Sequence, residues 1–522
     1  MGLLTLECTL ACTVPVSDPP TAQGTPQEPQ QSGEQAETDL AVAENESGGR
    51  VLIAGYRYTG SHPLHNNPES STDLVYLPGG GVEVARGASI MGWSYSTNAG
   101  LTWSAPGKIY PDAVFGDPMA VLWSDPALAV GMTNKRLVAY ASLSVSTERF
   151  DQHTGGGDVF FGWPPAINLP NNIIDGLCVA LSFTGGVSFP ALVCKVPDGI
   201  GAAGTDQTTI AIGRDDTIYT AVEDVSAART RLFKVVFGSD FDLSLEEIPM
   251  PTAMGNFSRG PELRRDQEGE VFLAATDQFT SREVRLCRVT PDGCLYLGEV
   301  TAATQVFADL VGSSVSALPL RSGVSVDFGV NHLASELGIR ELVFVYSRKP
   351  TPDRTVVGAT RCLSTLSTLL DCQDVPEWGT EQRAGQHFQP NLEFVDKSPE
   401  QNGSRPDWRY AFYEVDRPGV ASGHAQLTLA TLGGAQPSTN PLTLQYRTLV
   451  APDPRVCTAK YLYGASSEYW GDYMGFTALA PLGAEPWRHV VAYSSDERRG
   501  CDPTSHPLQG RHLHVESSFW TD

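Results

Sequence analysis

The chain has no long helical pattern and no long apolar run. No segment repeats apolar residues at the spacings i, i+3, i+4 and i+7, which excludes an extensively helical fold. No segment reaches the ~18 consecutive apolar residues of a membrane-spanning helix. G-x-S-x-G, P-loop and H-E-x-x-H motifs are also absent, so nothing marks the enzyme classes that carry them. Short β-branched and aromatic runs between Gly, Pro, Asn and Asp remain, and they predict an all-β chain.

Basic residues are also scarce. The 36 Lys and Arg against 60 Asp and Glu give a formal net charge of −24. No basic stripe is present to neutralise nucleic-acid phosphates, and the same charge disfavours an anionic membrane surface. A local arginine cluster could still hold an acidic sugar. Neither a zinc-type Cys/His cluster nor EF-hand spacing occurs, so we expect no metal site. We also expect no cofactor and a monomeric protein.

The ten cysteines are few but ordered. Cys287 and Cys294 enclose a Pro-Asp-Gly turn, which places them on adjacent strands, close enough for a disulfide. Eight cysteines allow 105 pairings, of which local pairing is the simplest. The expected pairs are Cys178 with Cys194, Cys287 with Cys294, Cys362 with Cys372, and Cys457 with Cys501. Disulfides indicate an oxidising compartment and hence export.

Two short segments precede the main domain. Residues 1–12 are apolar and end in Leu-Ala-Cys, which is typical of the remnant of an export or lipoprotein signal with a lipidated Cys12. Residues 13–38 are rich in Pro, Gln, Ser, Thr and Glu and predict a disordered tether. Residues 39–522 would form the folded domain. The expected location is secreted, or the outer surface or periplasm with a lipid anchor.

One kind of strand recurs seven times. Each copy is apolar in its middle and polar at its end, as expected of a strand buried between sheets. The copies begin at Arg50, Arg136, Thr217, Glu270, Arg340, Trp408 and Arg488. Their spacing fits four strands with long loops, so we expect a seven-bladed β-propeller of four-stranded antiparallel blades. Six blades are the alternative, if the short third repeat merges with a neighbour.

A proline motif precedes several of these strands. The segments 125–128, 260–263 and 389–392 share the order residue–Pro–residue–Leu, and 470–476 takes the same place before the last copy. Proline suits the first residue of a strand because its missing N–H lies outside the ladder. These segments are therefore predicted to start the innermost strands, around a central channel.

The run Ser96–Trp103 predicts a tight hairpin. Asn98 and Gly100 tolerate turn dihedrals, and the Ser and Thr hydroxyls can bond the backbone of the loop. A degenerate copy occurs at Ser182–Phe189. The pattern resembles the Asp-box of the sialidase-type (BNR) β-propellers, with Asn98 in place of the Asp. Later repeats lack it and carry cysteine pairs, so we expect disulfides to clasp their hairpins instead.

This resemblance implies a catalytic scheme that the sequence matches in part. Sialidases of this superfamily hold the sugar carboxylate with three arginines, and use an Asp as acid/base and a Tyr–Glu pair as nucleophile. Arg57 stands in the region of the family's Arg-Ile-Pro motif, but no Ile-Pro follows it. Three tyrosines lie on the recurrent strands and are interpreted as core residues: Tyr346, Tyr413 and Tyr493. The catalytic candidates are then Arg57, Asp472 and Tyr473.

Residues at the strand entries are the candidates for ligand binding. The segment around Asp472 combines acids and aromatics, which suits stacking on a sugar ring. The set expected at the channel mouth is Asp125, Arg259, Glu262, Gln389, Asn391, Trp470, Asp472 and Tyr473. The alternative for each of these residues is a polar side chain that is solvated or hydrogen-bonded to the backbone and binds no ligand. We expect an exported propeller that binds a glycan or a surface protein, with an exo-sialidase-type glycoside hydrolase as the alternative.

Overall fold

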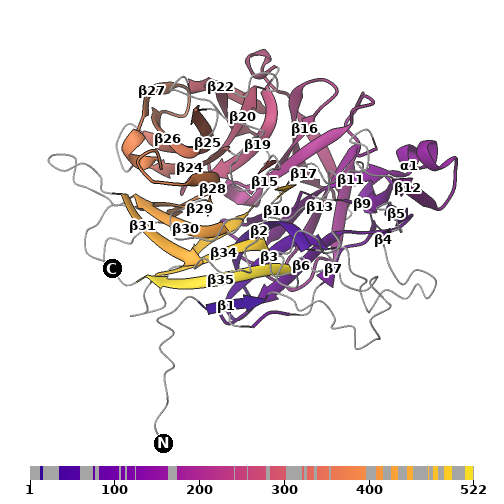
Figure 1. Ribbon diagram of the computed structural model, residues 1–522. Helices are drawn as coiled ribbons and strands as arrows, with labels where there is room; N and C mark the ends of the chain where they lie inside the picture. The colour runs from indigo at the N-terminus through magenta and orange to yellow at the C-terminus, as the bar shows by residue number, and fades with distance from the viewer. Residues whose placement is uncertain are drawn as a thin grey trace, which may run out of the picture.

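The structure is a computed structural model that describes most of the chain. The described residues are 12–15, 35–58, 74–76, 82–100, 102–104, 107–111, 114–123, 125–162, 173–239, 242–255, 257–277, 283–300, 320–321, 326–333, 338–351, 354–395, 407–415, 425–432, 444–450, 468–469, 474–479, 487–495 and 512–520. They form antiparallel sheets around a central axis (Figure 1). The all-β propeller fold expected from the sequence is confirmed.

Each sheet of the ring is a meander whose first strand is innermost; the sheets are numbered here in chain order. Sheet 1 contains β2 (Gln35–Glu44), β3 (Arg50–Tyr58), β6 (Met91–Ser96) and β7 (Gly107–Lys108). Sheet 2 contains β10 (Ala127–Val130), β11 (Val138–Ser146), β13 (Gly176–Ser182) and β14 (Ala191–Lys195), joined by β8 (Val114–Gly116) and β9 (Met119–Leu122). Sheet 3 contains β15 (Thr205–Ile212), β16 (Ile218–Asp224), β17 (Arg229–Phe237) and β18 (Leu243–Ile248).

The remaining sheets of the ring repeat the same order. Sheet 4 contains β19 (Phe257–Arg265), β20 (Val271–Asp277), β21 (Val284–Thr290) and β22 (Gly293–Val300). Sheet 5 contains β24 (Val326–His332), β25 (Arg340–Thr351), β26 (Arg354–Ser364) and β27 (Leu369–Asp374). Sheet 6 contains β28 (Gln386–Val395), β29 (Asp407–Val415), β30 (Ala425–Leu432) and β31 (Leu444–Val450). Sheet 7 contains β33 (Gly475–Leu479), β34 (Trp487–Ser495), β35 (His512–Trp520) and β1 (Cys12–Pro15).

Smaller elements decorate the ring. The helix α1 (Thr147–Thr154) lies beside a small sheet at one edge of the molecule (Figure 1). That sheet contains β4 (Leu74–Tyr76), β5 (Val82–Ala85) and β12 (Val159–Gly162). Elsewhere β23 (Leu320–Arg321) pairs with β32 (Glu468–Tyr469), and 3-10 turns occupy Arg214–Asp216, Thr252–Met254 and Pro376–Trp378. Among the described residues, no helix has the length and apolar character needed to cross a membrane.

The number of blades depends on how sheet 2 is counted. Among the described residues, six sheets of the ring have four strands, which matches the lower of the two expected numbers. Sheet 2 has six strands, and its strands β10, β11, β13 and β14 follow the same meander order. The innermost strands contact one another in a closed sequence, β2–β10–β15–β19–β24–β28–β33–β2. Sheet 2 therefore occupies its own position in the ring between sheets 1 and 3.

The N-terminal strand joins the C-terminal sheet. Strand β1 pairs antiparallel with β35, with Cys12 opposite Ser517. Residues 13–15 and 35–38, which the sequence analysis placed in a tether, therefore belong to β1 and β2. The rest of that segment and residues 1–11 lie outside the described residues. Pairing of β1 with the last sheet ties the first described residues of the chain to the last sheet of the ring and covers its edge.

The core lies between the faces of adjacent sheets. In the second strand of each meander both faces are covered, so β11 is buried along its whole length. The side chains of Ile53 in sheet 1 and Tyr140 in sheet 2 belong to one buried cluster with Leu128. Both are almost fully removed from solvent. This explains the apolar middle of the recurrent strand, because burial of apolar surface stabilises the packing of neighbouring sheets.

The hairpin at Ser96–Trp103 has the geometry expected from its sequence. The Ser96 hydroxyl oxygen accepts from Gly100 N at 2.8 Å, and Asn98 Oδ1 accepts from Thr102 N at 2.9 Å. Gly100 has a positive φ of 87°, a conformation that glycine adopts without strain. Asn98 thus replaces an Asp without loss of the acceptor.

The degenerate copy repeats this scheme in sheet 2. Ser182 Oγ accepts from Gly186 N at 2.9 Å, and Thr184 Oγ1 accepts from Ser188 N at 3.2 Å. A threonine hydroxyl therefore takes the place of the carboxylate. Both hairpins join the third and fourth strands of their sheets, at the end where the first strand of each sheet ends.

Three of the expected disulfides are present. Cys178–Cys194, Cys287–Cys294 and Cys362–Cys372 each link the third and fourth strands of a sheet. In sheets 4 and 5 the disulfide occurs where the hairpin pattern is missing, as expected. Sheet 2 has both the hairpin motif at Ser182–Phe189 and the disulfide Cys178–Cys194, so the disulfide does not replace the motif there. The pair Cys457–Cys501 lies outside the described residues.

Candidate functional site

The proline motifs lie in the innermost strands and connect neighbouring sheets. Only the motif 125–128 stands at a strand start, that of β10, as expected; the motifs 260–263 and 389–392 lie in the middle of β19 and β28, at shifts of strand register that leave an N–H unpaired in the ladder. Leu128 N donates to Asp39 Oδ2 of sheet 1 at 2.6 Å, and Leu392 N donates to Asp327 Oδ2 of sheet 5 at 2.6 Å. Leu263 N donates to Thr209 Oγ1 of sheet 3 at 3.0 Å. The leucine of each motif therefore presents its N–H to the preceding sheet. Side chains thus satisfy strand edges that would otherwise expose unpaired backbone groups.

Other bonds complete a circle of such links around the axis. Gln207 N donates to Asp125 Oδ2 at 3.0 Å, which connects sheet 3 to sheet 2. Asn391 Nδ2 donates to Met474 O at 2.8 Å and connects sheet 6 to sheet 7. Gly475 N donates to Thr38 Oγ1 at 3.0 Å and returns the circle to sheet 1. Polar groups in or directly before the innermost strands thus hold the ring together.

A cluster of charged side chains lies on this circle. Arg264 of β19 reaches Asp327 Oδ1 of β24 through Nη2 at 2.6 Å and Glu262 Oε2 through Nη1 at 3.2 Å. The exposed fractions of these side chains are 33% for Arg264, 17% for Glu262 and 5% for Asp327. Asp39 and Glu393 act electrostatically on the same guanidinium. We call Asp39, Glu262, Arg264, Asp327 and Glu393 the axial cluster.

Burial sets the protonation of the axial cluster. It raises the pKa of Glu262 to about 8 and that of Glu393 to about 8, although Arg264 favours the charged forms. It also raises the pKa of Asp39 to about 6, against hydrogen bonds from backbone N–H groups. Asp327 and Asp39 carry charge of the same sign and raise the two glutamate values further. Near neutral pH both glutamates are therefore mostly uncharged acids.

A cavity of about 370 Å³ opens in the ring beside this cluster. Its lining includes Arg264, Arg265 and Glu393, together with apolar residues of β10, β15, β24 and β28. Arg265 Nη1 donates to Val130 O at 2.8 Å and to Ile212 O at 2.9 Å. Its Nε and Nη2 atoms make no hydrogen bond to the described residues, and no described carboxylate lies within ion-pair distance. Burial lowers the pKa of this guanidinium.

The structure places some of the expected binding residues and leaves others outside. Asp125 and Asn391 connect sheets, which agrees with the backbone-bonding interpretation, whereas Glu262 belongs to the axial cluster. Arg259 and Gln389 lie in β19 and β28, as expected, but their side chains are not among those described. Trp470, Asp472 and Tyr473 lie outside the described residues.

The side chains of the catalytic candidates Arg57, Asp472 and Tyr473 lie outside the described part of the chain. Arg57 lies in β3, the second strand of sheet 1, and its side chain is not described. Tyr346 is fully buried and shares a 3.1 Å hydrogen bond with Thr360, so the core interpretation holds. Tyr413 is also buried, and burial raises its pKa. Tyr493 lies in β34, with its side chain outside the described set. The described residues contain no group of three metal-ligating side chains.

Sequence reasoning missed most of the axial cluster. Its members Asp39, Arg264, Asp327 and Glu393 were not among the candidates, and neither was Arg265 of the cavity lining. A signal existed in β19 and β28, where a charged residue directly follows the leucine of the proline motif. The clue was incomplete, since no sequence pattern says which of these strands face the same part of the channel.

Comparisons with known proteins give relatives by structure only. No protein family and no curated protein matches the sequence. The Hadza microbial sialidase Hz136 is 13% identical, covers 73% of this chain and has a TM-score of 0.35; the match spans 63% of that sialidase. The intramolecular trans-sialidase from Ruminococcus gnavus is 11% identical over 92% of this chain and 94% of its own, with a TM-score of 0.36. The polysaccharide lyase Uly1 is 9% identical over 92% of this chain and 89% of its own, with a TM-score of 0.40. The structural neighbours thus include sialidases, and at such identities the likeness concerns the fold alone.

Proposed function

We propose that the chain is an exported β-propeller that binds an acidic glycan in the axial cavity. The observation that carries the proposal is Arg265, a half-buried guanidinium that lines the cavity without a carboxylate partner among the described residues. Its free N–H groups can donate to a ligand carboxylate, and a buried cation attracts an anion more strongly than an exposed one. The neighbouring cation Arg264 is already neutralised by Asp327.

The rest of the cavity suits a sugar of limited size. A volume of about 370 Å³ falls at the lower end of the range for small-ligand pockets. Glu393 lines the cavity as an uncharged acid near neutral pH, so it can donate to a sugar hydroxyl and does not repel an anion. The three disulfides agree with an oxidising compartment, which supports export.

Arg265 provides the test of this proposal. We expect the wild-type chain to bind the methyl glycosides of N-acetylneuraminic acid or galacturonic acid in calorimetry. Arg265→Met should weaken binding about tenfold or more, because a charge-assisted bond is lost. Arg265→Lys keeps the charge and should give an intermediate affinity. Arg136→Met removes an exposed arginine of the surface pair with Glu46 and should leave binding unchanged. Unchanged affinity in a folded Arg265→Met chain, or no binding of either glycoside, contradicts the proposal.

A glycoside hydrolase is the second candidate, and the pKa values of Glu262 and Glu393 favour it. A general acid must hold its proton near the working pH, and both groups have a pKa of about 8. Hydrolysis of a fluorogenic sialoside should then fall above about pH 8 and be lost in Glu393→Gln or Glu262→Gln. Arg57→Ala tests the residue that the family resemblance pointed to. If the wild-type chain binds the glycoside but does not hydrolyse it, the hydrolase is contradicted and the binding function stands.

A further inference from the structure

A second cavity lies beside α1, away from the axial lining residues. Its volume is about 540 Å³. One wall is formed by α1 with Arg149 and Gln152, and another by the last residue of β14, Lys195, with residues 196–200 that follow it. Asp117 and Pro118, between β8 and β9, contribute a further part of the lining. We call this cavity the α1 pocket; it shares no lining residue with the axial cavity.

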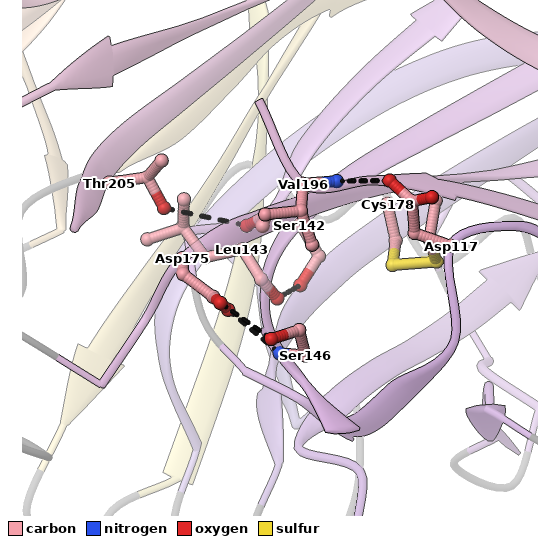
Figure 2. Close-up of a disulfide and its surroundings, with 10 residues drawn as sticks. Asp117, Ser142, Leu143, Ser146, Asp175, Cys178, Val196 and Thr205 are labelled. Atoms are coloured by element: carbon pink, nitrogen blue, oxygen red, sulfur yellow. Dashed lines mark hydrogen bonds between the residues drawn. A yellow bond between two sulfur atoms is a disulfide. The ribbon is translucent and has the colours of Figure 1, made fainter. Parts of the chain in front are cut away.

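The wall after β14 is fixed by covalent and hydrogen bonds. The buried disulfide Cys178–Cys194 joins β13 to β14 immediately before Lys195. Asp117 N donates to Cys194 O at 3.1 Å, and Asp117 Oδ2 accepts from Val196 N at 2.8 Å. Figure 2 shows Asp117 and Val196 joined next to this disulfide. Lys195 is thus attached to a backbone with little freedom to move.

The helical wall is equally well defined. Ser146 caps α1 by accepting from Arg149 N at 3.1 Å. Its own N and Oγ donate to the two oxygens of Asp175, at 2.7 and 2.5 Å (Figure 2). Arg149 Nε lies 3.6 Å from Asp175 Oδ2, and its Nη2 donates to Gly201 O at 3.2 Å. The helix start is therefore held both to Asp175, directly before β13, and to the segment after β14 before any ligand binds.

Several polar groups of the pocket remain available to a ligand. Lys195 Nζ is 3.8 Å from Asp117 and 3.6 Å from Asp198, both longer than a hydrogen bond. Arg149 Nη1 makes no hydrogen bond to the described residues. Gln152 Nε2 donates to Glu148 Oε1 at 3.2 Å, which leaves its carbonyl oxygen free to accept. Donors and acceptors therefore face the same cavity.

The charges of the lining decide which ligand class fits. The lining holds two cations, Arg149 and Lys195, and four carboxylates, Glu148, Asp117, Asp175 and Asp198. Two positive and four negative charges give a local excess of two negative charges, which opposes an anionic ligand. The lining contains no aromatic residue, so a flat aromatic ligand would find no stacking partner there. An uncharged polyhydroxyl ligand matches alternating donors and acceptors without a cost in charge.

We propose that the α1 pocket is a second saccharide site, which takes an uncharged hexose unit through its hydroxyl groups. Lys195 and Arg149 donate to ring hydroxyl oxygens, while Asp117 and Gln152 accept from hydroxyl groups. The site is separate from the axial cavity and does not depend on a function there. Lys195 lies near the carboxylates of Asp117 and Asp198 but beyond hydrogen-bond distance of both, so a sugar hydroxyl can bridge the ammonium group and a carboxylate.

Full-length protein and four simple probes test this proposal. In saturation-transfer NMR, at least one methyl glycoside of galactose, glucose, mannose or N-acetylglucosamine should bind. The double variant Lys195→Met and Gln152→Ala should weaken that binding about tenfold, since two bonding groups are lost. Lys135→Met is the matched control, because Lys135 is an exposed lysine paired with Glu44 on another surface. Arg265→Met should retain binding of the uncharged glycoside.

Three results would overturn the second saccharide site. The first is that none of the four glycosides binds. The second is that a glycoside binds equally well to the folded double variant. The third is that binding disappears in Arg265→Met while the double variant retains it, which would place the uncharged sugar in the axial cavity. Loss of acidic-glycan binding in Arg265→Met with unchanged hexose binding contradicts neither proposal and separates the two sites.

Discussion

Two buried groups of carboxylates in this ring have opposite protonation behaviour. Glu262 and Glu393 of the axial cluster have pKa values raised to about 8. Glu414 of sheet 6 is fully buried, and yet its pKa is lowered to about 2. Burial opposes the charged form in both places, so burial alone cannot explain the difference.

The number of hydrogen-bond donors around each carboxylate explains the difference in pKa. Glu414 accepts two bonds from Arg383, both at 2.8 Å, one from Thr428 Oγ1 at 2.9 Å and one from His387 at 3.3 Å. These bonds outweigh the effect of burial on the pKa of Glu414. In the axial cluster, by contrast, Arg264 serves Glu262 and Asp327 and acts at longer range on Asp39 and Glu393. A carboxylate with several donors of its own stays charged inside the ring, whereas one that shares a cation holds its proton.

The largest expected effect is loss of the cation from the sheet 6 group. Arg383→Met leaves Glu414 buried without its bidentate partner, which should destabilise the fold by about 3–5 kcal/mol. Urea unfolding followed by tryptophan fluorescence measures the change. The double variant Arg383→Met and Glu414→Gln should recover a large part of it. Arg361→Met, whose side chain is 42% exposed and pairs with Glu341, should cost about 1 kcal/mol or less. A small effect of Arg383→Met would contradict the explanation given for Glu414.

The axial cluster should show itself in the pH dependence of stability. A carboxyl whose folded pKa is raised binds its proton more tightly in the folded state, so its contribution is present at low pH and declines as pH rises toward about 8. Glu393→Gln removes the part of this dependence that comes from Glu393, whereas Glu262 keeps its own. Between about pH 5 and pH 9 the free energy of unfolding should shift in favour of this variant by about 4 kcal/mol, because each unit of pKa difference corresponds to about 1.4 kcal/mol. The same shift measured for Glu299→Gln, which is 28% exposed, serves as control and should be near zero.

The sheet 6 group should behave in the opposite way. Because the pKa of Glu414 is lowered, its stabilisation is present above the unfolded value and is lost as pH falls toward about 2. Burial also lowers the pKa of His387, so the neutral imidazole is favoured in the folded state and stability is lost as pH falls below the ordinary pKa of a histidine. Thr428→Val removes one donor and should cost about 1 kcal/mol at neutral pH. It should also move the acid unfolding midpoint to higher pH, and an unchanged midpoint would contradict the role assigned to Thr428.

Local patterns in the sequence predicted the hairpins and the innermost strands well. The bonds of Ser96, Asn98, Gly100 and Thr102 form within eight residues, so the sequence contains every partner. The cysteine pairs within adjacent strands have the same local character. Proline was interpreted correctly as a mark of the innermost strands, but only Pro126 stands at a strand start; Pro261 and Pro390 lie in the middle of β19 and β28, at shifts of strand register. In each case the pattern and its physical cause lie in one short segment.

Contacts between sheets were beyond the sequence. Asp39 and Leu128 are 89 residues apart in the chain, and Asp327 meets Leu392 across 65 residues. Glu262 was expected at the channel mouth, but nothing in its neighbourhood predicted that Asp327, 63 residues from Arg264, would share this arginine with it. The α1 pocket likewise combines residues of β8–β9, α1 and the segment after β14. Such partners depend on the order of sheets in the ring and on the registers of their strands.

The sequence by itself determined the strand class, the repeated meander, the two hydroxyl-clasped hairpins and three disulfides. These features depend on short-range periodicity and on partners that the chain supplies within a few residues. The tertiary structure alone decided which carboxylates share Arg264, that Arg265 lacks a carboxylate partner among the described residues, and that a pocket forms beside α1. Closure of the ring brings distant strand starts together in a place with little water. There, each charge depends on the number of donors it meets, and no local segment specifies that number.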